Sequence, residues 1–197
     1  ALVAIFLLAA LARIYPITKM EYCANDCYST HLKTSLNFIW SMDEFPNTQC
    51  SWYNREDLFN SFYKLSSDGM DLHRLNDELE ASNHPPLYYG LIHIFQSMNQ
   101  EGFPFYDGAY ILNLCFSLLS IWVFFLILSH LFDKDYLVLL GTLWFALSFG
   151  VLQMVLRHKA YELQLLLSLI LVLMVFRQYD RERLSVKDYI SFGLVCL

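Results

Sequence analysis

Long apolar runs separated by short polar connectors make up the second half of the chain. Residues 108–132 and 136–156 contain no charged side chain, and residues 163–176 repeat this pattern. An α-helix needs roughly 20 apolar residues to cross a bilayer. The connectors, 133–135 and 157–159, leave room only for tight hairpins. Because a spanning helix satisfies its own backbone hydrogen bonds in lipid, the pattern predicts an all-α integral membrane protein built as a polytopic helical bundle.

Two more apolar runs lie at the ends of the sequence. The chain opens inside one, without an initiating Met, and stops inside the other. We therefore expect an N-terminal piece of a longer protein. The expected organisation is a truncated first helix at 1–12, a long external loop at 13–106, and transmembrane helices at 107–132, 136–156, 160–176 and, truncated, 189–197.

The long loop carries apolar residues at helical spacing. Leu32, Leu36 and Ile39 form one set, and Leu58 and Phe62 belong to another. Such spacing is typical of short amphipathic helices that lie on a membrane surface. A small globular cap packed by the same residues is the alternative.

Basic residues in the short loops predict the orientation of the bundle. The loop 177–188 holds four Lys and Arg residues, which places it in the cytoplasm by the positive-inside rule. Counting back through the spans places 133–135 inside and both 157–159 and 13–106 outside. The external loop contains twelve acids and six bases, so it carries the whole net charge of −6. We expect a protein of a bacterial cell membrane with this loop on the external side.

The overall composition excludes several classes of protein. Hydrophobic residues make up 56% of the chain and charged residues only 16%, against roughly 25% charged in soluble domains. So apolar a chain does not remain unfolded in water. The negative net charge, without any basic run, argues against a nucleic-acid partner.

Three cysteines lie in the long loop. In an oxidising compartment Cys50 can pair with Cys23 or Cys27, which leaves one thiol over. Cys23 and Cys27 could alternatively begin a metal site, but no matching Cys/His pair follows them. The sequence fixes neither arrangement.

The most distinctive local pattern is Asn83-His84-Pro85-Pro86-Leu-Tyr-Tyr89. Two consecutive prolines pre-set the backbone for the start of a helix, and Asn83 or His84 can cap that helix. The structural interpretation is a helix N-terminus and nothing more. The functional interpretation adds that a rigidly held His84, beside a helix end that favours anions, is a donor for a phosphate or a sugar.

His84-Pro-Pro-Leu-Tyr-Tyr89, preceded by an acidic external loop after the first span, resembles the GT-C superfamily of membrane glycosyltransferases. The similarity is greatest to proteins related to protein O-mannosyltransferases and to the aminoarabinose transferase of lipid A. It implies transfer of a sugar from a polyprenyl-phosphate donor to a glycan, lipid or protein acceptor on the external face. In that family a carboxylate general base deprotonates the acceptor hydroxyl, and the anomeric carbon is inverted.

Two acidic positions match the family's base. Asp26, in Asn25-Asp26-Cys-Tyr-Ser-Thr-His-Leu32, lies at the family's distance from the first span, although Asn25 stands where the family has its Asp. Asp43 forms the Asp-Glu pair but comes later in the chain. A neutral hydroxyl must lose its proton as it attacks, which is why this chemistry needs a carboxylate. Three alternatives remain: the base is Asp26, the base is Asp43, or this sequence contains no catalytic carboxylate.

A second correspondence lies at the hairpin 157–161. The family's Arg-x-Tyr-x-Leu element matches Lys159, in place of Arg, and Tyr161. With Arg157, these residues would bind the donor phosphate at the outer membrane edge. Lys keeps the charge of Arg but loses its bidentate geometry. The alternative is that Arg157 and Lys159 simply extend to the lipid headgroups.

Other interpretations stay open at this stage. Glu162, just inside an apolar run, is expected to face the bundle interior because a charge is costly in lipid. Asp77, Glu78 and Glu80 are surface acids or, beside His84, part of a divalent-metal site; no other cofactor follows from the sequence. A transporter or flippase of lipid-linked glycans and a non-catalytic membrane subunit are the rival functions.

Overall fold

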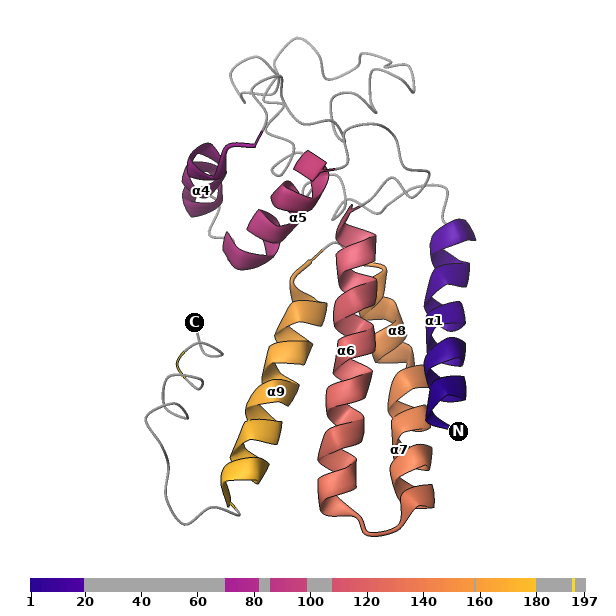
Figure 1. Ribbon diagram of the computed structural model, residues 1–197. Helices are drawn as coiled ribbons and strands as arrows, with labels where there is room; N and C mark the ends of the chain where they lie inside the picture. The colour runs from indigo at the N-terminus through magenta and orange to yellow at the C-terminus, as the bar shows by residue number, and fades with distance from the viewer. Residues whose placement is uncertain (20–69, 82–85, 99–107, 158, 180–192, 194–197) are drawn as a thin grey trace. The chain divides into compact units, whose positions relative to one another are not determined.

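The computed structural model describes residues 1–19, 70–81, 86–98, 108–157, 159–179 and 193, and every regular element among them is an α-helix. The described chain divides into two compact units. One holds α1, α6 from Asn113 onward, α7, α8 and α9; the other holds α4, α5 and the first residues of α6. Figure 1 shows the helices in order.

Two helices of the first unit are long and apolar enough to cross a membrane. They are α6, Gly108–Leu131, and α9, Tyr161–Tyr179. A third candidate consists of α7, Asp135–Leu147, and α8, Phe149–Val155, which are bent by 50° at their junction. These two or three candidate spans confirm the prediction of an all-α chain with the character of an integral membrane protein.

Helix α1 is longer than its apolar run. It covers Leu2–Lys19 and contains Pro16, although the sequence pattern predicted the first helix only at 1–12. Proline lacks the N–H that would bond Ala12, yet the helix continues past it. The extension brings Arg13, counted in the sequence analysis among the bases of the external loop, into the body of a helix.

The run 136–156, expected to be one span, is broken at Ser148. Ser148 has an extended backbone, with φ −63° and ψ 135°, and ends α7 while preceding α8. Its N–H bonds the carbonyl of Phe145, and its own carbonyl accepts the N–H of Leu152. The i→i−4 ladder of an α-helix is therefore interrupted, which leaves carbonyls at the end of α7 without their helical partners.

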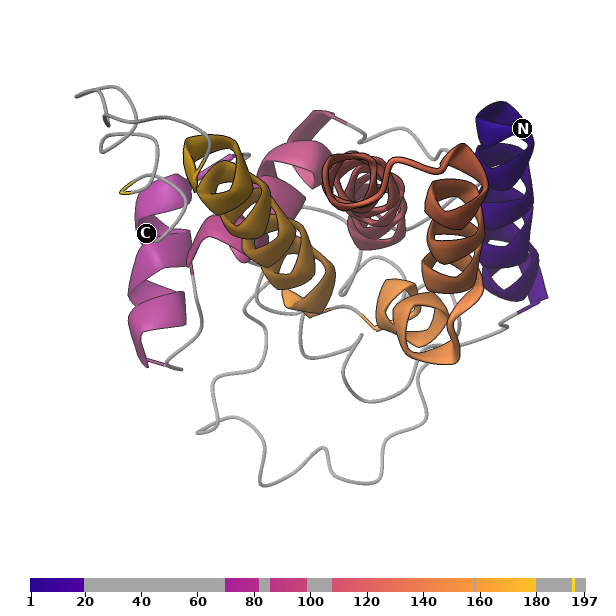
Figure 2. The same cartoon turned by 90° about the horizontal axis from the view of Figure 1, so that it is seen from below.

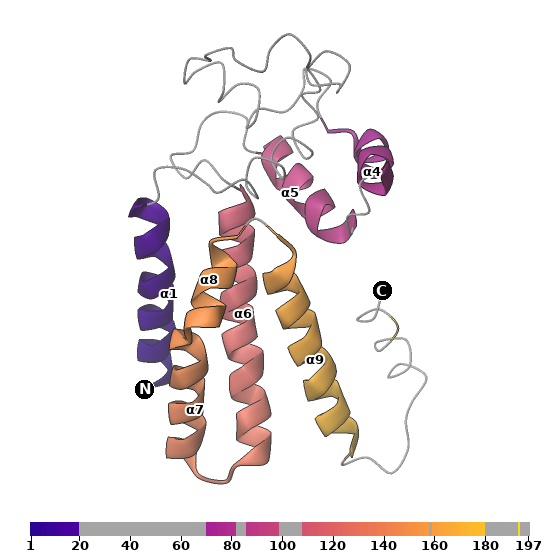
Figure 3. The same cartoon turned by 180° about the vertical axis from the view of Figure 1, so that it is seen from behind.

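Two apolar clusters hold these helices together. Ile5 and Ala9 of α1 pack with Ile121 of α6 and Ala146 of α7. The second cluster joins the later part of α6 to α9, through Val123, Ile127, Leu166 and Leu173. Helix α1 runs beside α7 and α8, as Figures 2 and 3 show from two directions.

Close approach between α6 and α7 depends on a small residue. A Cβ atom at Gly141 would lie 2.7 Å from Cδ1 of Leu128. Phe124 and Phe145 stack nearby, with ring centroids 4.2 Å apart and planes at 18°. Small residues that let helices approach closely are common where membrane helices pack.

Among the described residues of the second unit, two short helices pack on each other, α4, Leu72–Ala81, and α5, Pro86–Met98. Asp71 caps α4, because its Oδ1 accepts the N–H of Arg74 at 3.0 Å. The N–H of Asp71 in turn donates to Nε2 of His93 at 3.0 Å. Buried His93 of α5 therefore fixes the start of α4.

Candidate functional site

Arg13 lies at the centre of a polar cluster inside the first unit. Its side chain is 1% exposed. Nε donates to Oγ of Ser117 on α6 at 2.9 Å. Nη1 donates to the carbonyl of Ala9, one turn earlier in α1, and to the carbonyl of Ala146 at the end of α7, both at 3.0 Å. One guanidinium group thus bonds three helices.

The break in the third span explains why a guanidinium fits at this point. In a continuous helix the carbonyl of Ala146 would accept the N–H of Gly150, but the backbone turns out of the helix at Ser148. The C-terminal end of a helix carries a partial negative charge, which favours a cation. Arg13 therefore replaces the missing donor and supplies the favoured charge at the same position.

Glu162 gives Arg13 its counter-charge. It is 0% exposed, in the first turn of α9, and interacts electrostatically with Arg13. This position confirms the expectation that Glu162 faces the interior. The Ser117 hydroxyl also interacts with this carboxylate, but neither carboxylate oxygen has a partner at hydrogen-bonding geometry among the described residues, and neither does Nη2 of Arg13.

A second buried side chain, Asn113, bonds carbonyls at the end of α8, the other half of the broken span. Nδ2 of Asn113 on α6 donates to the carbonyl of Arg157 at 2.7 Å and to that of Val155 at 3.4 Å. These carbonyls follow or end α8, where no further helical turn supplies donors. Arg13 therefore supplies a donor to a carbonyl at the end of α7, and Asn113 does the same for the carbonyls at the end of α8.

Chemically, this arrangement is a buried guanidinium and a buried carboxyl group that interact electrostatically, each placed at a helix end. Glu162 lies at the start of α9, where the helix dipole favours an anion, and Arg13 meets the end of α7, where it favours a cation. Ionisable residues within membrane spans are costly and mark functional positions more often than structural ones. We call Arg13, Ser117, Glu162 and the Ala146 carbonyl the Arg13 cluster.

The residues predicted to bind a donor phosphate lie between α8 and α9. Arg157 is exposed, Lys159 is half-buried, and Tyr161, 40% exposed, begins α9. Arg157 is held through its backbone, since its carbonyl accepts the Asn113 bond. Its guanidinium thus lies at the surface beside the end of a candidate span.

The Pro-Pro motif leads directly into a helix. Helix α5 begins at Pro86, as the sequence pattern predicted. Tyr88 and Tyr89 are buried, and their rings meet edge to face at 5.5 Å. The motif therefore ends in a well-packed first turn.

The other predicted site residues lie outside the described residues. They are the candidate bases Asp26 and Asp43, the motif residue His84, and the cysteines Cys23, Cys27 and Cys50. Within the described ranges, no group of three or more His, Cys, Asp or Glu side chains could hold a metal ion. Asp77 is exposed and lies 3.3 Å from Nδ1 of His73, one helical turn away.

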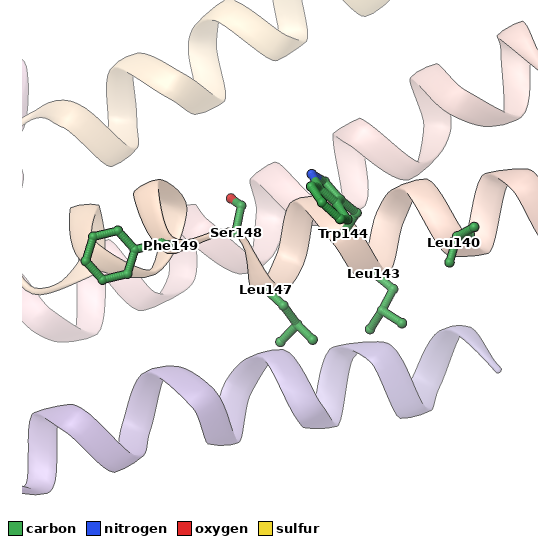
Figure 4. Close-up of a pocket in the computed structure, with 6 residues that line it drawn as sticks. All are labelled: Leu140, Leu143, Trp144, Leu147, Ser148 and Phe149. Carbon is green, nitrogen blue, oxygen red and sulfur yellow. The ribbon is translucent and has the colours of Figure 1, made fainter.

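An apolar groove of about 530 Å³ follows α7 to the break, lined by Leu140, Leu143, Trp144, Leu147, Ser148 and Phe149. Figure 4 shows Leu143 and Leu147 pointing toward α1 and Trp144 pointing away from it. Trp144 is the most exposed of the large apolar side chains in the described residues, at 81%. A surface of this kind suits hydrocarbon chains.

Sequence reasoning missed Arg13, Ser117 and Asn113 as parts of a buried site. The sequence contained one signal for Arg13. It directly follows the apolar run 1–12 and lies four residues, or one helical turn, after Ala9. Asn113 and Ser117 are spaced four residues apart within an otherwise apolar run, so they share one helix face. Comparison of the chain with protein-family models, curated proteins and solved structures finds no match.

Proposed function

We propose that this protein is a membrane glycosyltransferase of the GT-C type. It transfers a sugar from a polyprenyl-phosphate donor to a glycan, lipid or protein acceptor on the external face of the membrane, with inversion at the anomeric carbon. The observation that carries the proposal is the His84-Pro-Pro-Leu-Tyr-Tyr89 motif, whose second proline begins α5 and whose tyrosines are buried.

The membrane character of the chain supports the choice of a lipid-linked donor. Two or three helices are long and apolar enough to span a bilayer, so the protein and a polyprenyl phosphate would share one phase. The apolar groove along α7 is a surface on which the isoprenoid chain can pack. Exposed Arg157 and nearby Lys159, at the end of a candidate span, offer positive charge to the donor phosphate.

Each proposed site residue has one role. Asp26 is the general base that takes the proton of the acceptor hydroxyl, and Asp43 is the alternative for that role. His84 positions the acceptor or the phosphate. Lys159 and Arg157 bind the donor phosphate beside Tyr161. The phosphate-linked leaving group departs with little help from an acid, so one carboxylate is enough.

The test is sugar transfer by the full-length protein in proteoliposomes. Donors are polyprenyl-phosphate sugars, including mannose and aminoarabinose, with the sugar radiolabelled. Asp26→Asn is expected to lower the rate by about 10²- to 10⁴-fold, the usual contribution of a general base. Arg157→Gln and Lys159→Gln are expected to raise the KM for donor with a smaller effect on kcat.

Asp133→Asn serves as the matched control, because Asp133 is an exposed acid that lies between α6 and α7, outside the proposed site. It is expected to leave the rate unchanged. If Asp26→Asn and Asp43→Asn both transfer sugar at the wild-type rate, the carboxylate mechanism is wrong.

A transporter or flippase of lipid-linked glycans is the second candidate. It is favoured by the broken span α7–α8 and by buried Arg13, which bonds the Ala146 carbonyl beside the break, since transporters build their sites from discontinuous helices and buried charges. Movement of a fluorescent polyprenyl-linked glycan between leaflets, without hydrolysis or transfer, would favour this candidate over the enzyme.

A further inference from the structure

The Arg13 cluster joins a helix end to a charge on a different helix. The break at Ser148 leaves the carbonyl of Ala146 without a helical donor, and Arg13 supplies one. The cost of burying Arg13 is offset by its three hydrogen bonds and by its electrostatic attraction to buried Glu162. A change of charge at Glu162 on α9 should therefore alter the hydrogen bond at the end of α7, because Arg13 of α1 makes that bond.

We propose that Arg13 is an interhelical lock, through which Glu162 at the start of α9 determines how tightly α1 holds the broken span α7–α8. In the closed lock the guanidinium bonds Ser117, Ala9 and Ala146 and is attracted by the Glu162 carboxylate. Loss of the carboxylate charge leaves an uncompensated cation in the interior, so the guanidinium withdraws. The Ala146 carbonyl then loses its donor, and α1 separates from α7.

The contact between α1 and α7 is where the opening of the lock should be measured. Apart from the Arg13 bond, the cluster that joins α1 and α7 is apolar, with Ile5, Phe6 and Ala9 from α1 and Ala146 and Phe145 from α7. In a membrane, close packing of this kind and hydrogen bonds between helices both drive helix association. The bond from Arg13 to the Ala146 carbonyl adds a polar link to this packing.

The experiment measures the distance between α1 and α7 in the full-length protein in lipid nanodiscs, by pulsed electron paramagnetic resonance. Nitroxide labels are attached at Leu11→Cys on α1 and Trp144→Cys on α7, both well-exposed positions. The five native cysteines are replaced by alanine. The wild-type lock is expected to give one narrow distance peak.

Glu162→Gln is the decisive variant, because Gln has nearly the shape of Glu without its charge. The lock predicts that the width of the distance distribution at least doubles, although Glu162 lies on neither labelled helix. Arg13→Met should broaden it as much or more. Arg177→Met, which removes an exposed charge elsewhere on α9, should leave the peak narrow.

Two further variants keep the test decisive if Arg13→Met fails to fold. Ser117→Ala removes the acceptor of Nε and should broaden the distribution to a smaller degree. Arg13→Met combined with Glu162→Leu removes the unpaired carboxylate, so it should fold, yet the peak should stay broad because Ala146 still lacks a donor. A narrow peak in Glu162→Gln, or in the folded double variant, would overturn the lock. The outcome does not depend on whether the protein transfers sugar.

Discussion

The two halves of α6 pack against their neighbours in different ways. In the first half the buried residues include Asn113, Ser117 and Ser120, which share one face. In the second half they are apolar, as at Val123 and Ile127. Both halves belong to one continuous candidate span with a mean hydropathy of 2.5. The polar half specifies which helix ends meet, while the apolar half supplies contact area without such specificity.

The comparison predicts different costs of substitution in the two halves. A substitution that removes a polar side chain from the polar half, or from a residue bonded to it, leaves a buried charge or carbonyl without its partner. This costs more than the lost hydrogen bond itself. A substitution in the apolar half acts through volume, and its cost depends on how the neighbours can adjust.

Arg13→Met should have the largest effect. It leaves the Glu162 carboxylate buried without a counter-charge and the Ala146 carbonyl without a donor. We expect a loss of about 3–5 kcal/mol in the free energy of unfolding, measured by denaturation with SDS in mixed micelles. Arg177→Met, at an exposed position, is the control and should cost less than ~0.5 kcal/mol. An Arg13→Met protein as stable as the wild type would show that the polar half is not decisive.

Gly141→Leu should rank next and tests the apolar half. Even a Cβ at Gly141 would lie 2.7 Å from Cδ1 of Leu128, so a Leu side chain there would displace Leu128 and overpack the space between α6 and α7, at about 1–3 kcal/mol. Gly150→Leu, the same substitution where a Cβ meets nothing within 4 Å, should cost little. The same denaturation assay compares them. Equal costs at the two glycines would show that close packing of α6 on α7 contributes nothing particular.

Asn113→Ala should cost about 1–2 kcal/mol, since it leaves two carbonyls at the end of α8 without their side-chain donor. The effect is smaller than at Arg13 because no charge is stranded and because water can reach exposed Arg157. Ser168→Ala is its control, because the exposed Ser168 hydroxyl bonds only within its own helix. Hydrogen exchange at the end of α8 should rise in Asn113→Ala alone, and unchanged exchange would contradict the capping role.

Phe124→Leu should have the smallest effect. It removes the stack with Phe145 but keeps an apolar side chain of similar reach. Offset aromatic pairs contribute about 0.5–1.5 kcal/mol beyond their buried area. Trp144→Leu, at an exposed position on the same helix as Phe145, is the comparison and should change stability less. A larger loss at Trp144 would mean that its exposed face has a partner.

The sequence predicts the helices well where hydropathy alone decides them. The charge-free run at 108–132 corresponds to α6, and the Pro-Pro corner marks the start of α5 at Pro86. The interior position of Glu162 also follows from the cost of a charge in lipid. In each case the local sequence carries the whole physical reason.

The break at Ser148 could not be predicted in this way. No proline interrupts the run 136–156, and the extended backbone at Ser148 is stable because Arg13, from the other end of the chain, bonds the Ala146 carbonyl. Arg13 in turn looks like an ordinary loop base until α1 is seen to continue through Pro16. Contacts between residues far apart in sequence decide both features. The roles of Asp26, Asp43 and His84 remain predictions, since these residues lie outside the described part of the chain.

The most direct test of the Arg13 cluster is a double-mutant cycle between Arg13 on α1 and Glu162 on α9, measured by denaturation of wild type, Arg13→Met, Glu162→Leu and the double variant. If the two side chains form one neutral pair, each single variant strands a buried charge and the double variant strands none. The double variant should then be more stable than the sum of the single losses by about 1–3 kcal/mol. Additive losses, within ~0.5 kcal/mol, would show that the two residues do not act together and would contradict this account of the bundle.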